Sequence, residues 1–115
     1  MNILQELNAL LGGFGVKVET GVFKNKAPDE YVVVTPMSDI YGLFADDQPQ
    51  FETQEARISL FSKINYLPRK NQIAKALLAA EFIITDRIYG GHEDDTEYFL
   101  YTLDVAKVYE LAEEE

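Results

Sequence analysis

The residues best suited to chemistry lie together in one short stretch. The single histidine, His92, follows two glycines and is itself followed directly by Glu93, Asp94 and Asp95. Three acids and an imidazole can in principle gather a hard cation, but the EF-hand spacing, with its central glycine and distant glutamate, is missing. A catalytic histidine needs a rigid and partly buried setting, whereas this one is expected in a turn. We therefore predict a solvated turn without catalytic or metal-binding residues.

Other candidate sites are weaker still. Residues 12–15 (GGFG) invite comparison with a phosphate-binding loop, but they follow a predicted helix and precede a strand, the reverse of the order that such loops require. Cysteine is absent, which excludes disulfides, thiolate metal sites and cysteine nucleophiles. Asp46 and Asp47 are interpreted as soluble turn formers. The sequence therefore predicts neither an enzyme nor a cofactor.

The charge of the chain is strongly acidic and unevenly placed. The formal net charge is −10, and from residue 86 to 115 ten acids face two bases, so that −8 of it lies in this last stretch. Such a balance disfavours a general nucleic-acid binder and an anionic membrane surface as partners. The acidic net charge is otherwise typical of a soluble protein.

The start of the chain lacks the basic and apolar regions of a signal peptide, and a protein assembled in the cytoplasm is expected.

Apolar periodicity predicts two helices and five strands in a single domain covering residues 1–112, with an acidic frayed tail at 113–115. Ile3, Leu7 and Leu10 define the first helical stripe, whereas Ala56, Ile58 and Leu60 alternate as in a half-buried strand. The predicted elements in the first half are a helix at 2–11, strands at 16–20 (with 22–23 as an extension) and 31–35, a turn at 24–29 and a long loop at 37–50. They are followed by a strand at 51–62, a helix after 65–68 with apolar residues Ile73, Ala74, Leu77 and Leu78, and strands at 82–89 and 96–109 around a turn at 90–95.

The fold class predicted from this order is α+β. The order is α-β-β-(long loop)-β-α-β-β, with a mostly antiparallel or mixed β-sheet and two helices packed on one face. The run Tyr31 to Thr35 is apolar on both faces, which is typical of a central, doubly covered strand. Glycines and acids between the last two strands predict a β-hairpin.

The predicted loop at 37–50 is unusual because it carries large apolar residues. Ile40, Tyr41, Leu43 and Phe44 lie among glycine, proline and acidic residues. Two interpretations stay open: these side chains fold back onto the domain's own core, or they form a surface that another protein covers. On the second interpretation, Ile40, Tyr41, Leu43, Phe44, Asp46 and Asp47 form a subunit or tube contact.

Asp104 is a charge between apolar neighbours in the last predicted strand. It shares a strand face with Leu100 and Thr102. An ion pair across the sheet with Arg57 or Arg87 is the favoured interpretation, and a contact with a neighbouring subunit is the alternative.

Four stretches and the order of elements resemble one protein family. The stretches are residues 27–35 (APDEYVVVT), 45–47 (ADD), 56–62 (ARISLFS) and 97–105 (EYFLYTLDV). Together they resemble the tail terminator, or tail completion, proteins of long-tailed non-contractile bacteriophages (siphoviruses) and prophages, which are also labelled minor capsid proteins. The resemblance implies a virion structural protein forming a homo-oligomeric ring, a hexamer, that caps the tail tube, ends tube polymerisation and joins the tail to the head connector.

The same resemblance implies partners and a place. The partners would be copies of the chain, the tail tube protein and the head–tail connector protein, with DNA only in transit through the channel and no membrane. The place would be the head-proximal end of the virion tail, after assembly in the host cytoplasm. The acids Glu93, Asp94, Asp95 and Glu97 are then expected near the lumen or a ring face, where they repel passing DNA. The alternative function is an acidic, nucleic-acid-mimicking regulatory protein that binds a DNA-binding protein.

Overall fold

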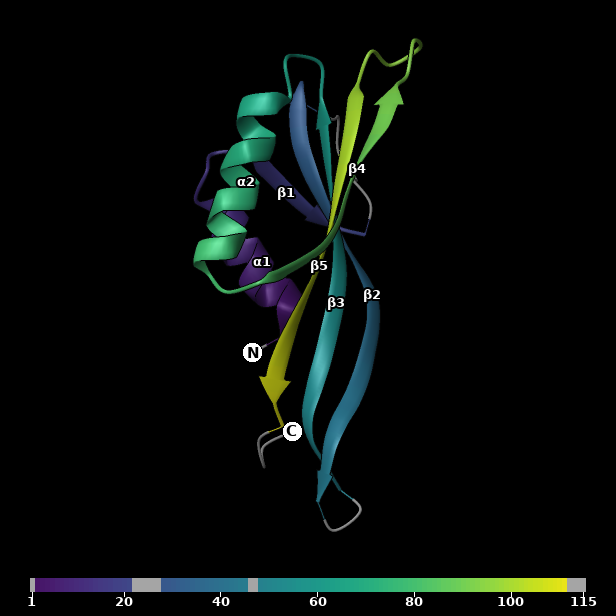
Figure 1. Ribbon diagram of the computed structural model, residues 1–115. Helices are drawn as coiled ribbons and strands as arrows, with labels where there is room; N and C mark the ends of the chain where they lie inside the picture. The colour runs from purple at the N-terminus through teal and green to yellow at the C-terminus, as the bar shows by residue number, and fades with distance from the viewer. Residues whose placement is uncertain (1, 22–27, 46–47, 112–115) are drawn as a thin grey trace.

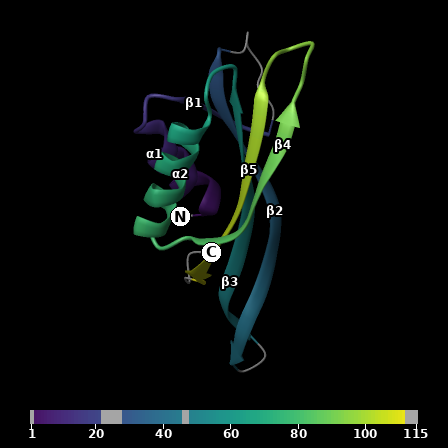
Figure 2. The same cartoon turned by 45° about the horizontal axis from the view of Figure 1, so that its top comes forward.

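The computed structural model describes residues 2–21, 28–45 and 48–111. For residues 43–45 and 48–50 it describes the backbone alone. Two helices pack on the same side of one twisted five-stranded sheet (Figures 1 and 2). The helices are α1 (Ile3–Gly12) and α2 (Leu67–Ala79), and the strands are β1 (Lys17–Thr20), β2 (Glu30–Ala45), β3 (Gln48–Ser62), β4 (Ile83–His92) and β5 (Phe99–Glu110). The predicted α+β class is confirmed.

Both helices begin at residues that satisfy free backbone N–H groups. At α1 the Asn2 side chain accepts from the Gln5 backbone N–H at 2.9 Å, while the Gln5 side chain accepts from the Asn2 N–H at 3.1 Å, a reciprocal capping box. At α2, Asn65 Oδ1 accepts from the Leu67 N–H at 3.1 Å and Pro68 occupies the first turn. Local sequence therefore fixes where each helix starts.

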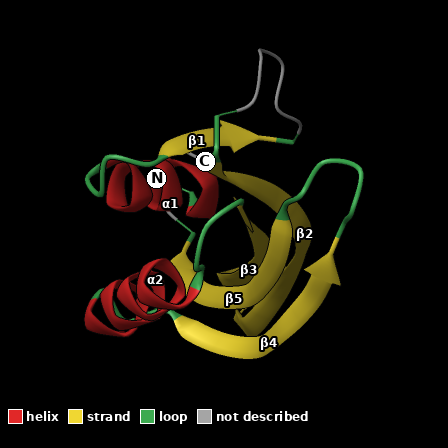
Figure 3. Ribbon diagram, turned by 90° about the horizontal axis from the view of Figure 1, so that it is seen from above, coloured by secondary structure: helices red, strands yellow, loops and turns green. Residues whose placement is uncertain are grey.

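The strand order in the sheet is β1-β2-β3-β5-β4. The β1–β2 pair is parallel, whereas β2–β3, β3–β5 and β4–β5 are antiparallel, so the sheet is mixed, as the sequence predicted. Viewed from above, the strands curve around the two helices (Figure 3). The sheet thus has an inner face, which the helices cover, and an outer face, which points away from them.

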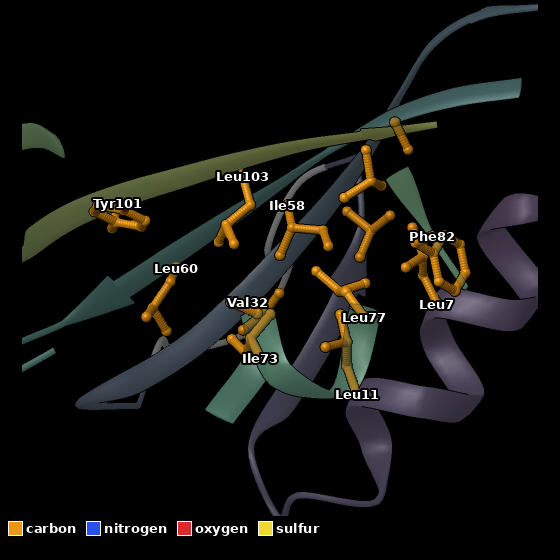
Figure 4. Packing of buried hydrophobic residues seen from close by; sticks show 14 of the residues in the cluster. Leu7, Leu11, Val32, Ile58, Leu60, Ile73, Leu77, Phe82, Tyr101 and Leu103 are labelled. Atoms are coloured by element: carbon orange, nitrogen blue, oxygen red, sulfur yellow. The ribbon is translucent and has the colours of Figure 1, made fainter. Parts of the chain in front are cut away.

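The core fills the space between the helices and the inner face (Figure 4). Both helices and the strands β2, β3 and β5 contribute fully buried side chains to it: Leu7, Leu11, Val32, Val34, Ile58, Leu60, Ile73, Leu77, Leu103 and Val105. Alternation along β3 buries Ala56, Ile58 and Leu60 completely, as predicted. In β2 the intervening Val33 is only 8% exposed although it lies on the outer face, which no helix covers, and β3 instead of β2 is the central strand of the sheet.

The prediction of a long loop at 37–50 was wrong. β2 continues to Ala45 and β3 begins at Gln48, with paired residues from Glu30↔Ser62 to Ala45↔Gln48 and one irregularity between Pro36 and Ser38. Glycine and aspartate lowered the local strand signal there, but pairing with the strongly patterned β3 outweighs local propensity. We call residues 37–45 and 48–53 the arm, and Figure 1 shows it extending beyond the helices at the lower end of the molecule.

Several smaller predictions differ from the structure. Leu78 was assigned to the buried face of α2, yet it is 62% exposed, because the inner face meets the stripe of Ile73, Ala74 and Leu77. The predicted turn at 90–95 starts later, since β4 runs to His92, and β5 begins at Phe99 instead of 96. Residues 22–27 and 113–115, with the predicted turn and tail, lie outside the described residues.

A partly buried lysine joins three elements at the inner face. Lys107 Nζ on β5 donates to Glu6 Oε2 on α1 at 2.7 Å and to the carbonyl oxygen of Ala80 at 3.0 Å, and it lies 4.6 Å from the ring centroid of Phe82. Burial opposes ionisation of Glu6, but hydrogen bonding to Lys107 and Tyr109 and the positive charge of Lys107 together outweigh it, and the pKa of Glu6 is lowered. The ionised carboxylate therefore stabilises the fold at neutral pH, and this stabilisation is lost as the pH falls through the lowered pKa.

Two adjacent leucines on α2 test the packing. Leu77 is fully buried and Leu78 is 62% exposed. We expect Leu77→Ala to lower the free energy of unfolding by about 2–5 kcal/mol, because it opens a cavity. The matched control Leu78→Ala should change it by less than about 0.5 kcal/mol. Urea unfolding followed by circular dichroism measures both, and equal losses would contradict the described orientation of α2.

Candidate functional site

The arm presents apolar side chains to solvent. Ile40 is 56% exposed and Tyr41 is 59% exposed, and because successive residues of a strand point to opposite faces, one lies on each face of the arm. Neither belongs to the core, so the interpretation that this segment folds back onto the core does not hold for them. Leu43 and Phe44 also lie in β2, and Asp46 and Asp47 fall outside the described residues.

A buried glutamine fastens the arm to the body. Gln54 Oε1 accepts from the backbone N–H of Ile3 at 2.8 Å, and its Nε2 donates to Glu52 Oε2 at 3.0 Å. Beside it, a polar hollow of about 510 Å³ separates the start of α1 from the arm, with Asp39, Glu52 and Glu55 in its lining. The arm therefore leaves the body at a defined point and direction.

The outer face carries apolar side chains in transverse rows. Residues paired across the strands share a face, so the register places Ile40, Thr53 and Val108 in one row. Val108 is 52% exposed, and Ile83 and Ile88 on the edge strand β4 are 55% and 48% exposed. Apolar area thus extends from the arm along the outer face.

An ion pair divides this apolar area. Arg57 Nε and Nη2 donate to Asp104 Oδ1 and Oδ2 at 2.7 and 3.0 Å, and the pair is formed across β3 and β5. This confirms the predicted cross-sheet partner of Asp104. Hydrogen bonding to Asp104 and the charges of Asp104 and Asp86 raise the pKa of Arg57. Asp86 lies opposite Asp104 on β4, so Arg57 offsets the repulsion between two neighbouring carboxylates.

The predicted acids lie at the other end of the molecule. Glu93, Asp94, Asp95 and Glu97 are all exposed in the turn between β4 and β5, which forms the upper end in Figure 1. The turn is held by hydrogen bonds from Glu93 N to the Tyr98 carbonyl at 3.0 Å and from Glu97 N to the Glu93 carbonyl at 2.7 Å. His92 Nδ1 lies 3.4 Å from Asp94 Oδ1. The molecule is 54 Å long, so the structure separates these acids from the arm.

An aromatic hollow lies just below the acids. Its volume is about 630 Å³, and it is lined by Tyr31, Phe61, Gly90, Gly91, His92, Glu93, Thr96, Tyr98 and Leu100. The rings of Tyr31 and Phe61 stack at 4.8 Å, and the ring of Tyr98 is nearly perpendicular to both. Its size and apolar lining are those of a typical ligand pocket.

Among the described residues, no group of three histidine or acidic side chains is placed to hold a metal ion. No helix in this part of the chain has the length and apolarity needed to cross a bilayer.

No protein-family model matches the chain, and no curated protein shows significant similarity to it. Its function is therefore inferred from its surfaces.

Sequence reasoning missed the hollow and found the acids beside it. Tyr31, Phe61 and Tyr98 are far apart in the sequence, and only the strand register brings them together. The pairing Tyr31↔Phe61 follows once β2 and β3 are recognised as one continuous hairpin, so the missed signal was the strand character of the arm.

The ion pair on the outer face yields a test in which a second mutation rescues the first. Replacing Arg57 with Gln leaves Asp86 and Asp104 facing each other without the cation, and we expect a lower urea midpoint. In the Arg57→Gln background, Asp86→Asn should restore at least half of the lost urea midpoint. In the wild-type background, the same substitution should not raise the urea midpoint. The four proteins form a double-mutant cycle, and additive effects would contradict the proposed electrostatic coupling.

Proposed function

We propose that the chain is a virion structural protein of a long-tailed bacteriophage or prophage. It forms a ring that caps the tail tube, ends tube polymerisation and joins the tail to the head connector. The observation that carries the proposal is the arm, a hairpin with exposed Ile40 and Tyr41 that is hydrogen-bonded to the body at its base and lies at the end of an elongated molecule. Such residues contribute most to binding when a partner desolvates them.

The backbone of the arm supports assembly as well. β1 pairs with residues 31–34 of β2, so within the described residues the outer edge of β2 from Ser38 to Ala45 has no strand partner. Exposed strand edges are templates for association, and proteins that stay monomeric protect them with lysine, proline or bulges. Pro36 and the neighbouring irregularity protect only the beginning of this edge. A neighbouring copy or the tail tube protein is the proposed cover.

The separation of the two ends fits a cap with two different contacts. The arm offers apolar area, whereas the opposite end presents exposed acids. In the proposed ring, subunit and tube contacts use the arm, and the acids lie near the channel or a ring face, where they keep passing DNA from binding. The connector protein completes the set of partners.

The alternative is an acidic protein that imitates nucleic acid and occupies a DNA-binding protein. The net charge of −10 and the four exposed acids favour it. A mimic, however, needs charges spaced like phosphates along a surface, and these four are confined to one turn. The assembly proposal accounts for the arm as well, and we prefer it.

The arm can be tested by removing its apolar side chains. Ile40→Ser/Tyr41→Ser should keep the fold, because both side chains are outside the core, but lose ring formation and tube capping. The matched control Ile64→Ser/Leu78→Ser removes residues of similar exposure elsewhere on the surface. Native mass spectrometry measures the assembly, and electron microscopy measures tube length with purified tail tube protein. A folded arm variant that caps tubes as well as wild type would overturn the proposal.

A triple variant separates the two functions. Asp94→Asn/Asp95→Asn/Glu97→Gln removes three exposed charges without changing the size of the side chains. In a tail terminator the variant should still assemble and cap tubes, whereas a nucleic-acid mimic should lose its partner, since that binding is largely electrostatic. A folded triple variant that no longer caps tubes would show that these acids belong to the assembly contacts.

A further inference from the structure

The arm has a strand edge that its own sheet leaves open. β1 pairs with β2 at residues 31–34, and the described residues provide no partner strand along 38–45. Residues 40–45 contain neither a charge nor a proline, and Asp39 is the one charged residue in 38–45. Lysine, proline and bulges are the usual means by which proteins protect such an edge from pairing. The irregularity between Pro36 and Ser38 lies before this segment, so its backbone is accessible to a further strand.

Both faces of this edge carry exposed apolar side chains. Ile40 is 56% exposed on one face of the arm and Tyr41 is 59% exposed on the other. Gly42 follows them, and a Cβ atom at this position would meet no other atom within 4 Å. Side chains of neighbouring strands on one face lie about 4.5–5.5 Å apart, so a strand added beside β2 would cover both faces at once.

The edge segment is complementary to itself in the antiparallel direction. Two identical antiparallel strands are symmetric about one position, and residues opposite each other must lie on the same face of the sheet. Symmetry about Gly42 meets this condition and brings apolar residues opposite apolar residues without placing two like charges opposite each other. The pairs between the two copies are then Ile40 with Phe44, Tyr41 with Leu43, Asp39 with Ala45, and Gly42 with itself.

The shape and the charge of the molecule favour this contact over others between copies. The arm extends beyond the helices at one end of a molecule 54 Å long (Figure 1), so two antiparallel arms can overlap while the bodies lie at opposite ends of the pair. The exposed acids of the turn between β4 and β5 lie at the end away from the arm. The net charge of −10 opposes self-association in general, but antiparallel arms keep the two acidic turns far apart.

We propose that, in the free protein, the arm edge of one copy pairs antiparallel with the arm edge of a second copy about a two-fold axis at Gly42. The contact is isologous and joins the β2 strands of both copies into one continuous sheet. Backbone hydrogen bonds supply the affinity, and the apolar pairs fix the register. This inference goes beyond the proposed function, because it concerns the chain before it meets another protein. On the proposed function, the paired arms also cover the tube contact until a tail tube is present.

Single cysteines test the contact directly, because the chain contains none of its own. Gly42→Cys places two thiols opposite each other across the axis, where the Cα atoms of an antiparallel pair lie about 4.5–5.5 Å apart, a distance that a disulfide spans. Mild oxidation of the full-length variant should therefore give a disulfide-linked dimer on a non-reducing gel. The matched control Ser38→Cys lies on the same edge, but its two thiols would be about 26 Å apart, at about 3.3 Å per residue, and should not crosslink.

A pair of charged variants tests the position of the axis. Gly42→Lys and Gly42→Glu each place two like charges opposite each other, and each should weaken dimer formation about fivefold. An equal mixture of the two variants should restore dimers, since opposite charges then face each other. Native mass spectrometry distinguishes the mixed dimer when one variant is ¹⁵N-labelled, and circular dichroism measures whether each variant is folded. If either charged variant loses its fold, the two cysteine variants decide the test.

Three results would overturn the inference. The first is a wild-type chain that stays monomeric up to about 1 mM. The second is equal crosslinking of Gly42→Cys and Ser38→Cys, and the third is a mixture of folded Gly42→Lys and Gly42→Glu that forms no more dimer than either variant alone. A chain that caps tail tubes without the Gly42→Cys crosslink would keep the proposed function and lose this inference, so the two can fail separately.

Discussion

The register of β3 is the constraint on which the rest of the structure depends. Every residue from Phe51 to Ser62 is paired on both sides, with β2 on one and β5 on the other. Ala56, Ile58 and Leu60 face the helices, and the residues between them face outward. A shift by one residue would turn this whole set to the outer face and break the core, so the pattern of β3 fixes its two neighbours as well. The arm, the ion pair of Arg57 and the stacking of Phe61 all follow from that single alignment.

How much the sequence predicts depends on whether a feature is local. The α1 stripe, the alternation of β3 and the α+β order could be predicted, because periodicity over a few turns or residues carries them. Arg57 was one of two arginines predicted as the partner of Asp104, because only a few arginines could reach it across a sheet. The arm was not, because the strand state of residues 37–45 comes from hydrogen bonding to a distant, better patterned strand. Leu78 was misplaced because helical spacing predicts which side of a helix is apolar, but not how far around the helix the buried stripe extends.

The candidate sites divide in the same way. The sequence singled out Ile40, Tyr41 and the acids of the β4–β5 turn by residue type alone, and the structure adds that they lie at opposite ends of the sheet. The aromatic hollow could not be predicted. Tyr31 and Phe61 come from β2 and β3 and Tyr98 directly precedes β5, so the pairing of these strands had first to be known. A side chain's type is readable locally, whereas its neighbours across a sheet are not.

The position of α2 within the connection between β3 and β5 has a consequence for the order of folding events. The hairpins β2–β3 and β4–β5 join strands that are close in the sequence, and hairpins of this kind form within about 1–10 μs. The β3–β5 pairing instead closes the segment 63–98, which contains α2, and long connections slow such closure. We therefore expect the two hairpins to form early and independently. The slowest step of folding is then the one in which α2 docks and β3 pairs with β5.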